Sequence, residues 1–349
     1  DLKMKQDDID SIIEACIRYP SGDNLQPWRF KKNNDNKVEI FRIATDHYLQ
    51  EKNYFARLEF GCLKTYLAIS AKQYGYNLSY EMFSENFSIK NKQVIWAIVH
   101  FEATSDKGHH LFHFLDKRVT DRRSYLKSDS NYINEDQQIK IISNDDKKLL
   151  KAISKVESLG WSNDYYSKDI LQYCNLSRSE NEKETGMAWR SLGISLPERL
   201  LLYSLKTIPW LSKLVRSTFF PFFYAINIQK LLQKSEGFFS VGATDNTDES
   251  IITCGETATN VWLDLMSHGY HCQPLSISSF FTSLNLSQID KREKSKAWSK
   301  SMEELQSIYV EKEIIPNKKS IHWIFRFGRP QKNFPGKTLR QKYKSAIIN

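Results

Sequence analysis

Residues 19–30 read Tyr19-Pro20-Ser21-Gly22-Asp23-Asn24-Leu25-Gln26-Pro27-Trp28-Arg29-Phe30 and join a short amphipathic segment to a strand-like one. Prolines fix φ and lack an N–H, and glycine permits a tight or left-handed turn. The short polar side chains of Ser21, Asp23 and Asn24 therefore project from a stiff loop, which can hold a planar polar ligand. The alternative is an ordinary helix-to-strand turn, and turn chemistry alone favours it.

The sequence on both sides of this loop predicts an α+β fold. Ile9, Ile12 and Ile13 recur at helical spacing, whereas residues 37–43 alternate between apolar and polar side chains as a half-buried strand does. Gly75 suits the C-terminal cap of a helix, because glycine tolerates positive φ. The pattern predicts helices over residues 8–18, 59–74 and 109–119 and strands over residues 37–43 and 93–101.

The second half of the chain repeats features of the first half in the same order. In each half a predicted helix carries glycines at equal spacing, follows the tripeptide Ala-Thr-Asp and precedes an apolar strand. The matching pairs are Gly61 and Gly255, Gly75-Tyr76 and Gly269-Tyr270, Ala44-Thr45-Asp46 and Ala243-Thr244-Asp245, and residues 93–101 and 321–327. Such agreement indicates two copies of one α+β unit, with two unrelated helix–strand units as the alternative.

Composition limits the classes of partner. The chain has 349 residues and a net charge of +9, but its basic residues form no dense block, so we expect an anionic cofactor rather than nucleic acid. Its five cysteines show no Cys-x-x-Cys spacing, which argues against zinc or a disulfide framework and favours a reducing, cytoplasmic compartment. The longest uncharged run, residues 217–229, is too short for a transmembrane helix. The chain begins at Asp1 without Met or a signal-peptide pattern, which leaves room for a segment upstream.

A second group of candidate binding residues comprises Arg118, Thr120 and Arg122. In an extended segment alternate side chains lie on one side, so the two guanidinium groups and the hydroxyl would face the same way. Such a set binds phosphate through charge-assisted hydrogen bonds. The alternative is a solvated basic end of the preceding helix, which the residue types favour in isolation.

The motif Pro-Ser-x-x-Asn-x-Gln-Pro-Trp at residues 20–28 resembles the flavin-contacting loop of the nitroreductase superfamily, whose members are FMN-dependent oxidoreductases. The spacing Arg118-x-Thr120-x-Arg122 is similar to that family's FMN-gripping element, with threonine in place of serine. The turn over residues 269–277 and the basic tail after residue 326 also resemble family elements. By this resemblance, the residues expected to contact FMN are Pro20, Ser21, Gly22, Asn24, Gln26, Arg118, Thr120, Arg122, Pro274, Leu275, Ser276, Ile277, Lys337 and Arg340.

The resemblance also implies individual roles. Arg118 and Thr120 would face phosphate and ribityl oxygens, and Arg122 would approach N1 and O2 of the flavin ring. A backbone N–H of Ser276 or Ile277 would bond N5, where many relatives have Glu-Gly instead. The tail residues Lys337 and Arg340 would reach the phosphate, and a merely solvated basic tail is the alternative.

Family members are usually homodimers of a unit about half this length, with FMN in the interface. The resemblance therefore implies a nitroreductase-like α+β fold duplicated within one chain, as an intramolecular pseudo-dimer with copies at residues 1–108 and 109–349. The Pro-Ser-x-x-Asn loop occurs only in the first copy and the Arg-x-Thr-x-Arg element only in the second, so one FMN per chain is expected. The likeness is greatest to a long, duplicated branch, some of whose members follow an E1-like, ThiF-type domain, and an upstream E1-like fusion therefore stays open.

An apolar insertion lies at about residues 196–234 of the second copy, and Pro197, Pro209 and Pro221 divide it into short predicted helices. Ordinary core packing is one interpretation, and a helical lid whose aromatic residues stack on a planar substrate is another. Peripheral membrane contact is a third, because Lys206 and Lys213 flank apolar residues as in interfacial helices.

Together these features predict an FMN-dependent oxidoreductase of the nitroreductase type. NADH or NADPH would be the donor and a small planar nitroaromatic or quinone the acceptor, or the protein would act as a flavin-dependent dehydrogenase in a biosynthetic pathway. We expect no catalytic side chain, since the chemistry is centred on the flavin, and no metal site. The alternative is a non-catalytic protein that binds and sequesters FMN.

Overall fold

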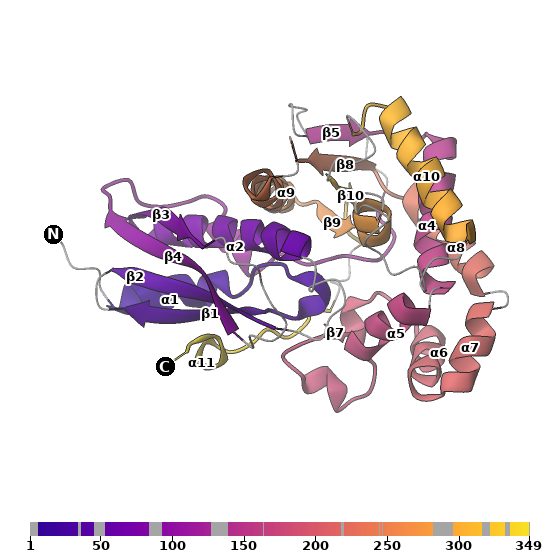
Figure 1. Cartoon of the computed structure of the whole chain (residues 1–349), viewed down its shortest axis with the longest axis horizontal. Helices are drawn as coiled ribbons and strands as arrows, with labels where there is room; N and C mark the ends of the chain where they lie inside the picture. The colour runs from indigo at the N-terminus through magenta and orange to yellow at the C-terminus, as the bar shows by residue number, and fades with distance from the viewer. Residues whose placement is uncertain are drawn as a thin grey trace.

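The structure is a computed structural model, which describes residues 6–33, 36–44, 53–83, 93–126, 139–162, 164–217, 220–243, 245, 247–281, 296–315, 322–331 and 336–348. Over these residues the fold is mixed α+β, as the sequence predicts, with two four-stranded antiparallel sheets (Figure 1). No helix within these ranges is both long enough and apolar enough to cross a membrane. Short helical turns lie at η1 (Gly22–Asn24), η2 (Glu180–Glu182), η3 (Trp189–Ser191) and η4 (Ile277–Phe281), of which the last is a π-helical turn.

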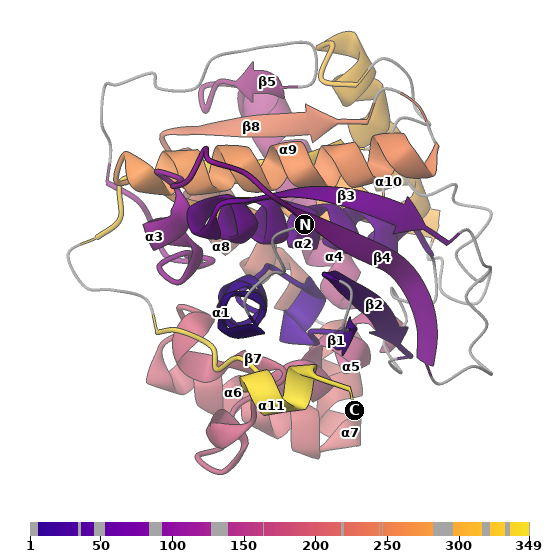
Figure 2. The ribbon, with the colours of Figure 1, turned by 90° about the vertical axis from the view of Figure 1, so that its left-hand side faces the viewer.

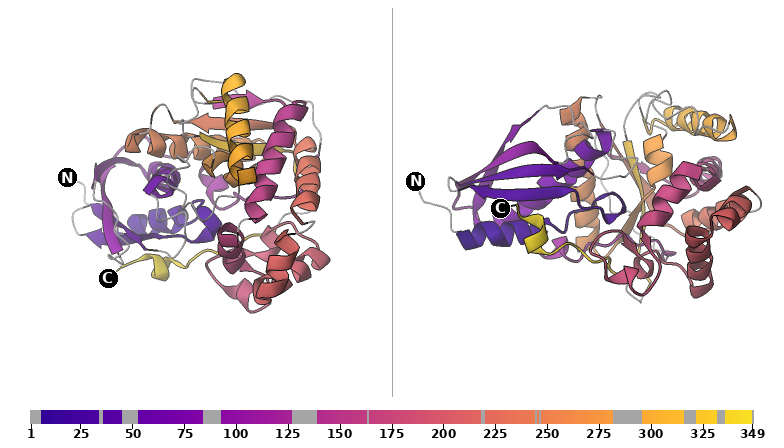
Figure 3. Two further views of the ribbon diagram at one scale, coloured as in Figure 1. Left: turned by 45° about the vertical axis from the view of Figure 1, so that its right-hand side comes forward. Right: turned by 60° about the horizontal axis from the view of Figure 1, so that its bottom comes forward.

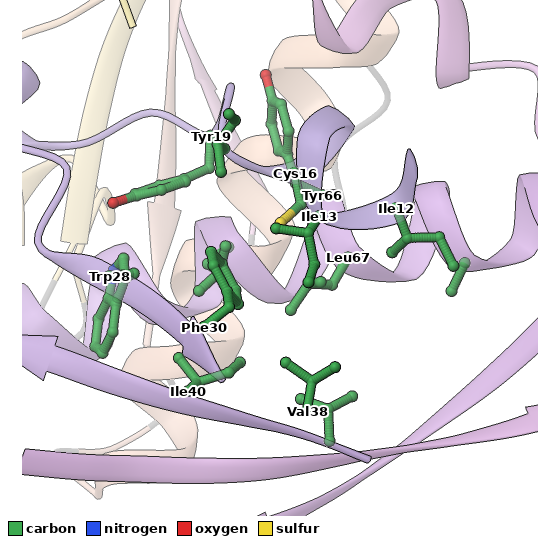
Figure 4. Close-up of a cluster of buried hydrophobic side chains, with 14 of the residues drawn as sticks. Ile12, Ile13, Cys16, Tyr19, Trp28, Phe30, Val38, Ile40, Tyr66 and Leu67 are labelled. Carbon is green, nitrogen blue, oxygen red and sulfur yellow. The ribbon is translucent and has the colours of Figure 1, made fainter. Parts of the chain in front are cut away.

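The first sheet is covered on one face. Its strands are β1 (Trp28–Asn33), β2 (Lys37–Ile43), β3 (Tyr76–Met82) and β4 (Gln93–Ala103), in the order β1-β2-β4-β3. Val38 and Ile40 of β2 are buried while their neighbours are partly exposed, as the alternating sequence predicts. Helices α1 (Gln6–Cys16) and α2 (Asn53–Tyr74) cover this face, and Figure 4 shows Ile13 and Leu67 of these helices meeting side chains of β1 and β2.

The second sheet is buried on both faces. Its strands are β5 (Ile139–Ile142), β8 (Gly237–Gly242), β9 (His271–Pro274) and β10 (His322–Gly328), in the order β5-β8-β10-β9. Phe239 and Phe325 stack at 4.7 Å in a core with α9 (Asp248–Ser267). The adjacent residues Phe238 and Ile324 pack instead with α4 (Lys147–Ser162) and α10 (Lys296–Glu311). This two-sided burial explains the continuous apolar runs in these strands.

Helices α2 and α9 cross between the two sheets (Figure 2). Two glycines permit the close approach: a Cβ on Gly61 would lie 2.1 Å from the carbonyl oxygen of Ile252, and a Cβ on Gly255 would lie 2.1 Å from that of Leu58. Each helix ends before a glycine with positive φ, +83° at Gly75 and +81° at Gly269. In each helix the first glycine, Gly61 or Gly255, thus lies at the crossing, and the second, Gly75 or Gly269, follows the helix end.

The apolar insertion forms three helices at the end of the molecule away from the N-terminus (Figure 3). They are α6 (Leu196–Thr207), α7 (Pro209–Ser217) and α8 (Phe220–Gln233), and each carries a proline in its first turn, as predicted. Before them lie α5 (Asp164–Tyr173) and the parallel strand pair β6 (Cys174–Asn175) and β7 (Met187–Ala188).

The C-terminal arm returns to the first sheet. After β10 of the second sheet the chain reaches α11 (Tyr343–Ala346) beside β1, where Ile348 N donates to Phe30 O at 2.8 Å. Residues 336–348 therefore join the two halves, and their path past the loop of residues 19–30 places them at the candidate site (Figure 1).

One predicted helix is wrong. Instead of a helix over residues 109–119, the structure has a single turn, α3 (Phe112–Leu115). The chain then becomes extended, because Asp121 N donates to Cys272 O of β9 at 3.1 Å and Thr120 forms a β-bridge with the same residue. The repeat residues Thr45, Asp46 and Thr244 lie outside the described residues.

Candidate functional site

The loop after α1 has a strained backbone. Asp23, Asn24 and Gln26 have φ values of +46°, +58° and +52°. A left-handed conformation costs a non-glycine residue roughly 1–2 kcal/mol, although Asn and Asp tolerate it better than most. Such strain persists only where the surroundings hold it, and it is concentrated at binding sites.

Hydrogen bonds from side-chain amides of the loop maintain this left-handed backbone conformation. Asn24 Nδ2 donates to Leu339 O at 2.8 Å, which ties the loop to the C-terminal arm. Gln26 Nε2 donates to Glu184 O at 2.7 Å, and its Oε1 accepts a hydrogen bond from Gln341 N at 2.9 Å. The amide of Gln26 is therefore used by the fold and is fully buried.

A cationic pocket of about 90 Å³ lies beside the loop. Its basic side chains come from the end of α1, the segment after α3 and the C-terminal arm, and they are Arg18, Arg118, Arg122, Lys337 and Arg340. Asp23 and Asp116 also line it, and Asp116 pairs with Arg18 at 3.3 Å. Because cations outnumber carboxylates, the pocket attracts an anion.

Two arginines of the pocket lie next to each other, Arg118 buried and Arg340 partly buried. Arg118 is 7% exposed, donates from Nε to the Tyr66 hydroxyl at 2.9 Å and stacks over Trp262 at 4.6 Å. Burial, and then the charge of Arg118, lower the pKa of Arg340 to about 9. Nη1 of Arg340 is buried without a hydrogen-bond partner among the described residues. A partly buried guanidinium whose buried Nη1 has no hydrogen-bond partner is costly, so a bound anion would stabilise this pair.

Asp121 fixes the segment that carries Arg118, Thr120 and Arg122. Its carboxylate accepts from Arg123 Nε at 2.9 Å and pairs with His271 at 2.9 Å. Although burial raises the pKa of Asp121, these hydrogen bonds hold it well below its usual range. The segment is thereby held in its extended course beside β9, and Arg118, Thr120 and Arg122 all line the cationic pocket.

An aromatic cavity of about 330 Å³ adjoins the cationic pocket. The two share Ser21, Asp23, Thr120, Arg122 and Met187 in their walls. Aromatic side chains from four helices and β10 line the cavity, namely Phe55, Trp161, Tyr224, Trp262 and Trp323. This volume is at the lower end of that of small-molecule pockets, and the walls are of the kind that hold a planar ring.

Two buried carboxyl groups line the aromatic cavity. Glu59 of α2 accepts a hydrogen bond from Gly22 N at 2.5 Å and so positions the loop. Glu157 of α4 accepts from Ser278 N at 2.9 Å and from the Ser278 hydroxyl at 2.8 Å. Burial raises the pKa of Glu157, which favours its protonated form. A carboxyl group of this kind can hold a proton next to a bound ring.

The structure brings most of the predicted site residues together. All except Gln26 and Leu275 line the cationic pocket or the aromatic cavity, and they come from both halves of the sequence. Gln26 is engaged with backbone groups, and Leu275 is buried in the core formed with α4 and α10. These two residues do not line either cavity, which departs from their expected contact with FMN. Lys337 donates to Asp116 O at 2.7 Å at the exposed rim of the site.

Glu157 and Trp262 line the aromatic cavity but belong to none of the motifs recognised in the sequence. Glu157 follows Ile153 by four residues, on a helix whose Leu149, Ile153 and Val156 are buried. A charged residue on an otherwise apolar helix face was therefore the available signal. Trp262 gave no comparable signal, because an aromatic residue at helical spacing reads as ordinary core.

The sequence matches no protein-family model, and a search of curated proteins finds no significantly similar one.

Proposed function

We propose that the protein binds FMN and is an oxidoreductase of the nitroreductase type. The main support is the Arg118 and Arg340 pair beside a cavity of aromatic side chains, because Nη1 of Arg340 is buried without a hydrogen-bond partner among the described residues and an anion would supply one. FMN joins a phosphate to a planar ring, so its two ends have the chemistry of the two adjoining sites. The residue motifs at 20–28 and 118–122 support the same cofactor through their resemblance to this superfamily.

In this proposal Arg118, Arg340 and Thr120 hold the phosphate and ribityl oxygens, and Arg122 lies near the polar edge of the ring. FMN would supply hydride transfer at its ring system. The protein's own groups bind and orient: the tryptophans exclude water, and Glu157, whose pKa is raised by burial, lines the aromatic cavity. NADH or NADPH as donor and a planar quinone or nitroaromatic as acceptor fit the apolar walls.

We further propose that the chain is a duplicated nitroreductase-like fold, with copies at residues 1–108 and 109–349. The corresponding strand orders, β1-β2-β4-β3 and β5-β8-β10-β9, support this, because the n-th strand of one sheet has its counterpart at the same place in the other. The reciprocal close approach at Gly61 and Gly255 also supports it. The C-terminal arm, which contacts β1, would then tie the second copy to the first.

A second candidate function is sequestration of FMN without turnover. It is favoured by the insertion, since Leu202 of α6 and Tyr224 of α8 form part of the cavity wall. In this case residues 196–234 would close off the ring instead of admitting a substrate.

Anaerobic mixing of the FMN-loaded protein with NADH or NADPH distinguishes the two candidates. We expect loss of the yellow flavin absorbance with at least one donor and its return on addition of a quinone such as menadione, because the aromatic cavity admits planar rings in turn. Bound FMN that neither donor reduces would reject the enzyme and favour sequestration. Failure of FMN to bind at all would reject both.

A further inference from the structure

Helix α7 carries apolar side chains outward and a polar one inward. Trp210 is 69% exposed and Leu214 is 53% exposed, whereas Ser212 between them is 3% exposed. In water a surface helix has the opposite arrangement, with its apolar stripe on the core. Trp210 and Leu214, four residues apart on α7, are therefore large apolar side chains that the fold of the described residues does not bury.

The neighbouring helices α6 and α8 also expose large apolar side chains. Together α6, α7 and α8 expose a set of large apolar side chains that we call the outer face: Leu196, Leu200, Leu201, Tyr203, Trp210, Leu214, Phe222 and Phe223. Most of the large hydrophobic residues that are exposed within the described ranges belong to this set. Monomeric proteins in water seldom gather so many exposed apolar residues, and such gatherings mark protein or membrane contacts.

The charge of these helices is strongly one-sided. Residues 196–234 contain six basic residues, Arg199, Lys206, Lys213, Arg216, Lys230 and Lys234, and a single acidic residue, Glu198. Glu198 is occupied at its own helix end, where its carboxylate accepts from Ser195 N at 2.6 Å. Lys206 pairs with Glu180 at 2.6 Å, whereas Lys213, Lys230 and Lys234 are exposed. An apolar face with basic residues around it is the composition of helices that lie in the headgroup region of an anionic bilayer.

The inner sides of two of these helices are already used, because Leu202 of α6 and Tyr224 of α8 line the aromatic cavity. The outer face is therefore the far side of a cavity wall and not an unfinished part of the core. Figure 3 places α6 and α7 at the periphery of the molecule, at the end away from the first sheet.

We propose that the outer face of α6–α8 docks on an anionic lipid surface. A second copy of the chain fits less well, because an isologous contact would set two equally basic faces against each other. In the lipid, the aromatic and leucine side chains enter the headgroup and acyl boundary while the lysines meet anionic headgroups. The contact is independent of any flavin.

Vesicle flotation tests this surface with the protein as it exists. We expect binding to phosphatidylcholine vesicles that contain phosphatidylglycerol, much weaker binding to phosphatidylcholine alone, and loss of binding as salt is raised. Trp210→Ser with Phe222→Ser should lower the partition coefficient about tenfold or more. Lys213→Gln, which removes one positive charge, should lower it on the order of fivefold on anionic vesicles alone. These residues are exposed, so the variants should keep the thermal stability of the parent protein.

Met82→Ser is the matched control, because Met82 is a large exposed hydrophobic residue on β3, outside the outer face. It should leave vesicle binding unchanged. The proposal is overturned if the protein floats with neither vesicle, or if the Trp210 and Phe222 double variant binds as well as the parent. It is also overturned if sedimentation shows self-association that this double variant abolishes while lipid binding is absent.

Discussion

Replacing Arg340 by alanine should weaken FMN binding by about 2 kcal/mol, roughly a thirtyfold rise in Kd, while leaving riboflavin binding almost unchanged. The reason is that riboflavin lacks the phosphate that we assign to the Arg118 and Arg340 pair. In the absence of a ligand the same change should raise the melting temperature, because it removes a desolvated cation whose neighbour Arg118 repels it. Fluorescence titration with both flavins and thermal unfolding measure the two effects.

Lys344→Ala is the control for that experiment. Lys344 is exposed on α11 and lines neither the cationic pocket nor the aromatic cavity, so its loss should change FMN affinity by less than about 1 kcal/mol. Equal losses of FMN and riboflavin affinity in Arg340→Ala would show that this arginine does not face the phosphate.

Gly61→Ala should lower the free energy of unfolding by about 3 kcal/mol or more. In an ordinary exposed helix this substitution stabilises by about 1 kcal/mol, so the expected sign is reversed. The cause is the crossing with α9, where the new methyl group would lie 2.1 Å from the carbonyl oxygen of Ile252 and the backbone of both helices would have to separate. Denaturant unfolding of the purified variant measures the change.

Ala68→Leu is a suitable control on the same helix, because Ala68 is exposed on α2. It adds more volume than Gly61→Ala but should change stability by no more than about 0.5 kcal/mol. Gly255→Ala should behave like Gly61→Ala, since its new methyl group would meet the Leu58 carbonyl at the same distance. A neutral or stabilising effect at both glycines would contradict the tight crossing.

Several strand and helix boundaries could be predicted from the residues at the boundaries themselves. Strand β2 has the predicted bounds because its apolar side chains alternate, and α2 and α9 end before glycines whose positive φ few other residues adopt. The prolines of the insertion begin α6, α7 and α8 because a proline is tolerated in the first turn, where its missing N–H has no helical partner. In these places the signal lies within a few residues.

Contacts between residues far apart in the chain could not be predicted from these local sequence patterns. The helix expected at residues 109–119 ends after one turn because the backbone of Asp121 pairs with Cys272, about 150 residues away in the chain and unrecognisable from local pattern. The same applies to Arg340, whose burial against Arg118 depends on the path of the C-terminal arm. The family resemblance predicts that Arg118 and Arg340 contact FMN. Their closeness to each other depends on the folded chain and could not be predicted from the sequence.

Equilibrium titration of the ligand-free protein with FMN and with riboflavin tests the central claim most directly. We predict one FMN per chain, because the loop at residues 20–24 and the segment at residues 118–122 form a single site, and we expect FMN to bind at least about tenfold more tightly than riboflavin. Absence of saturable FMN binding, two FMN per chain, or equal affinity for the two flavins would contradict it.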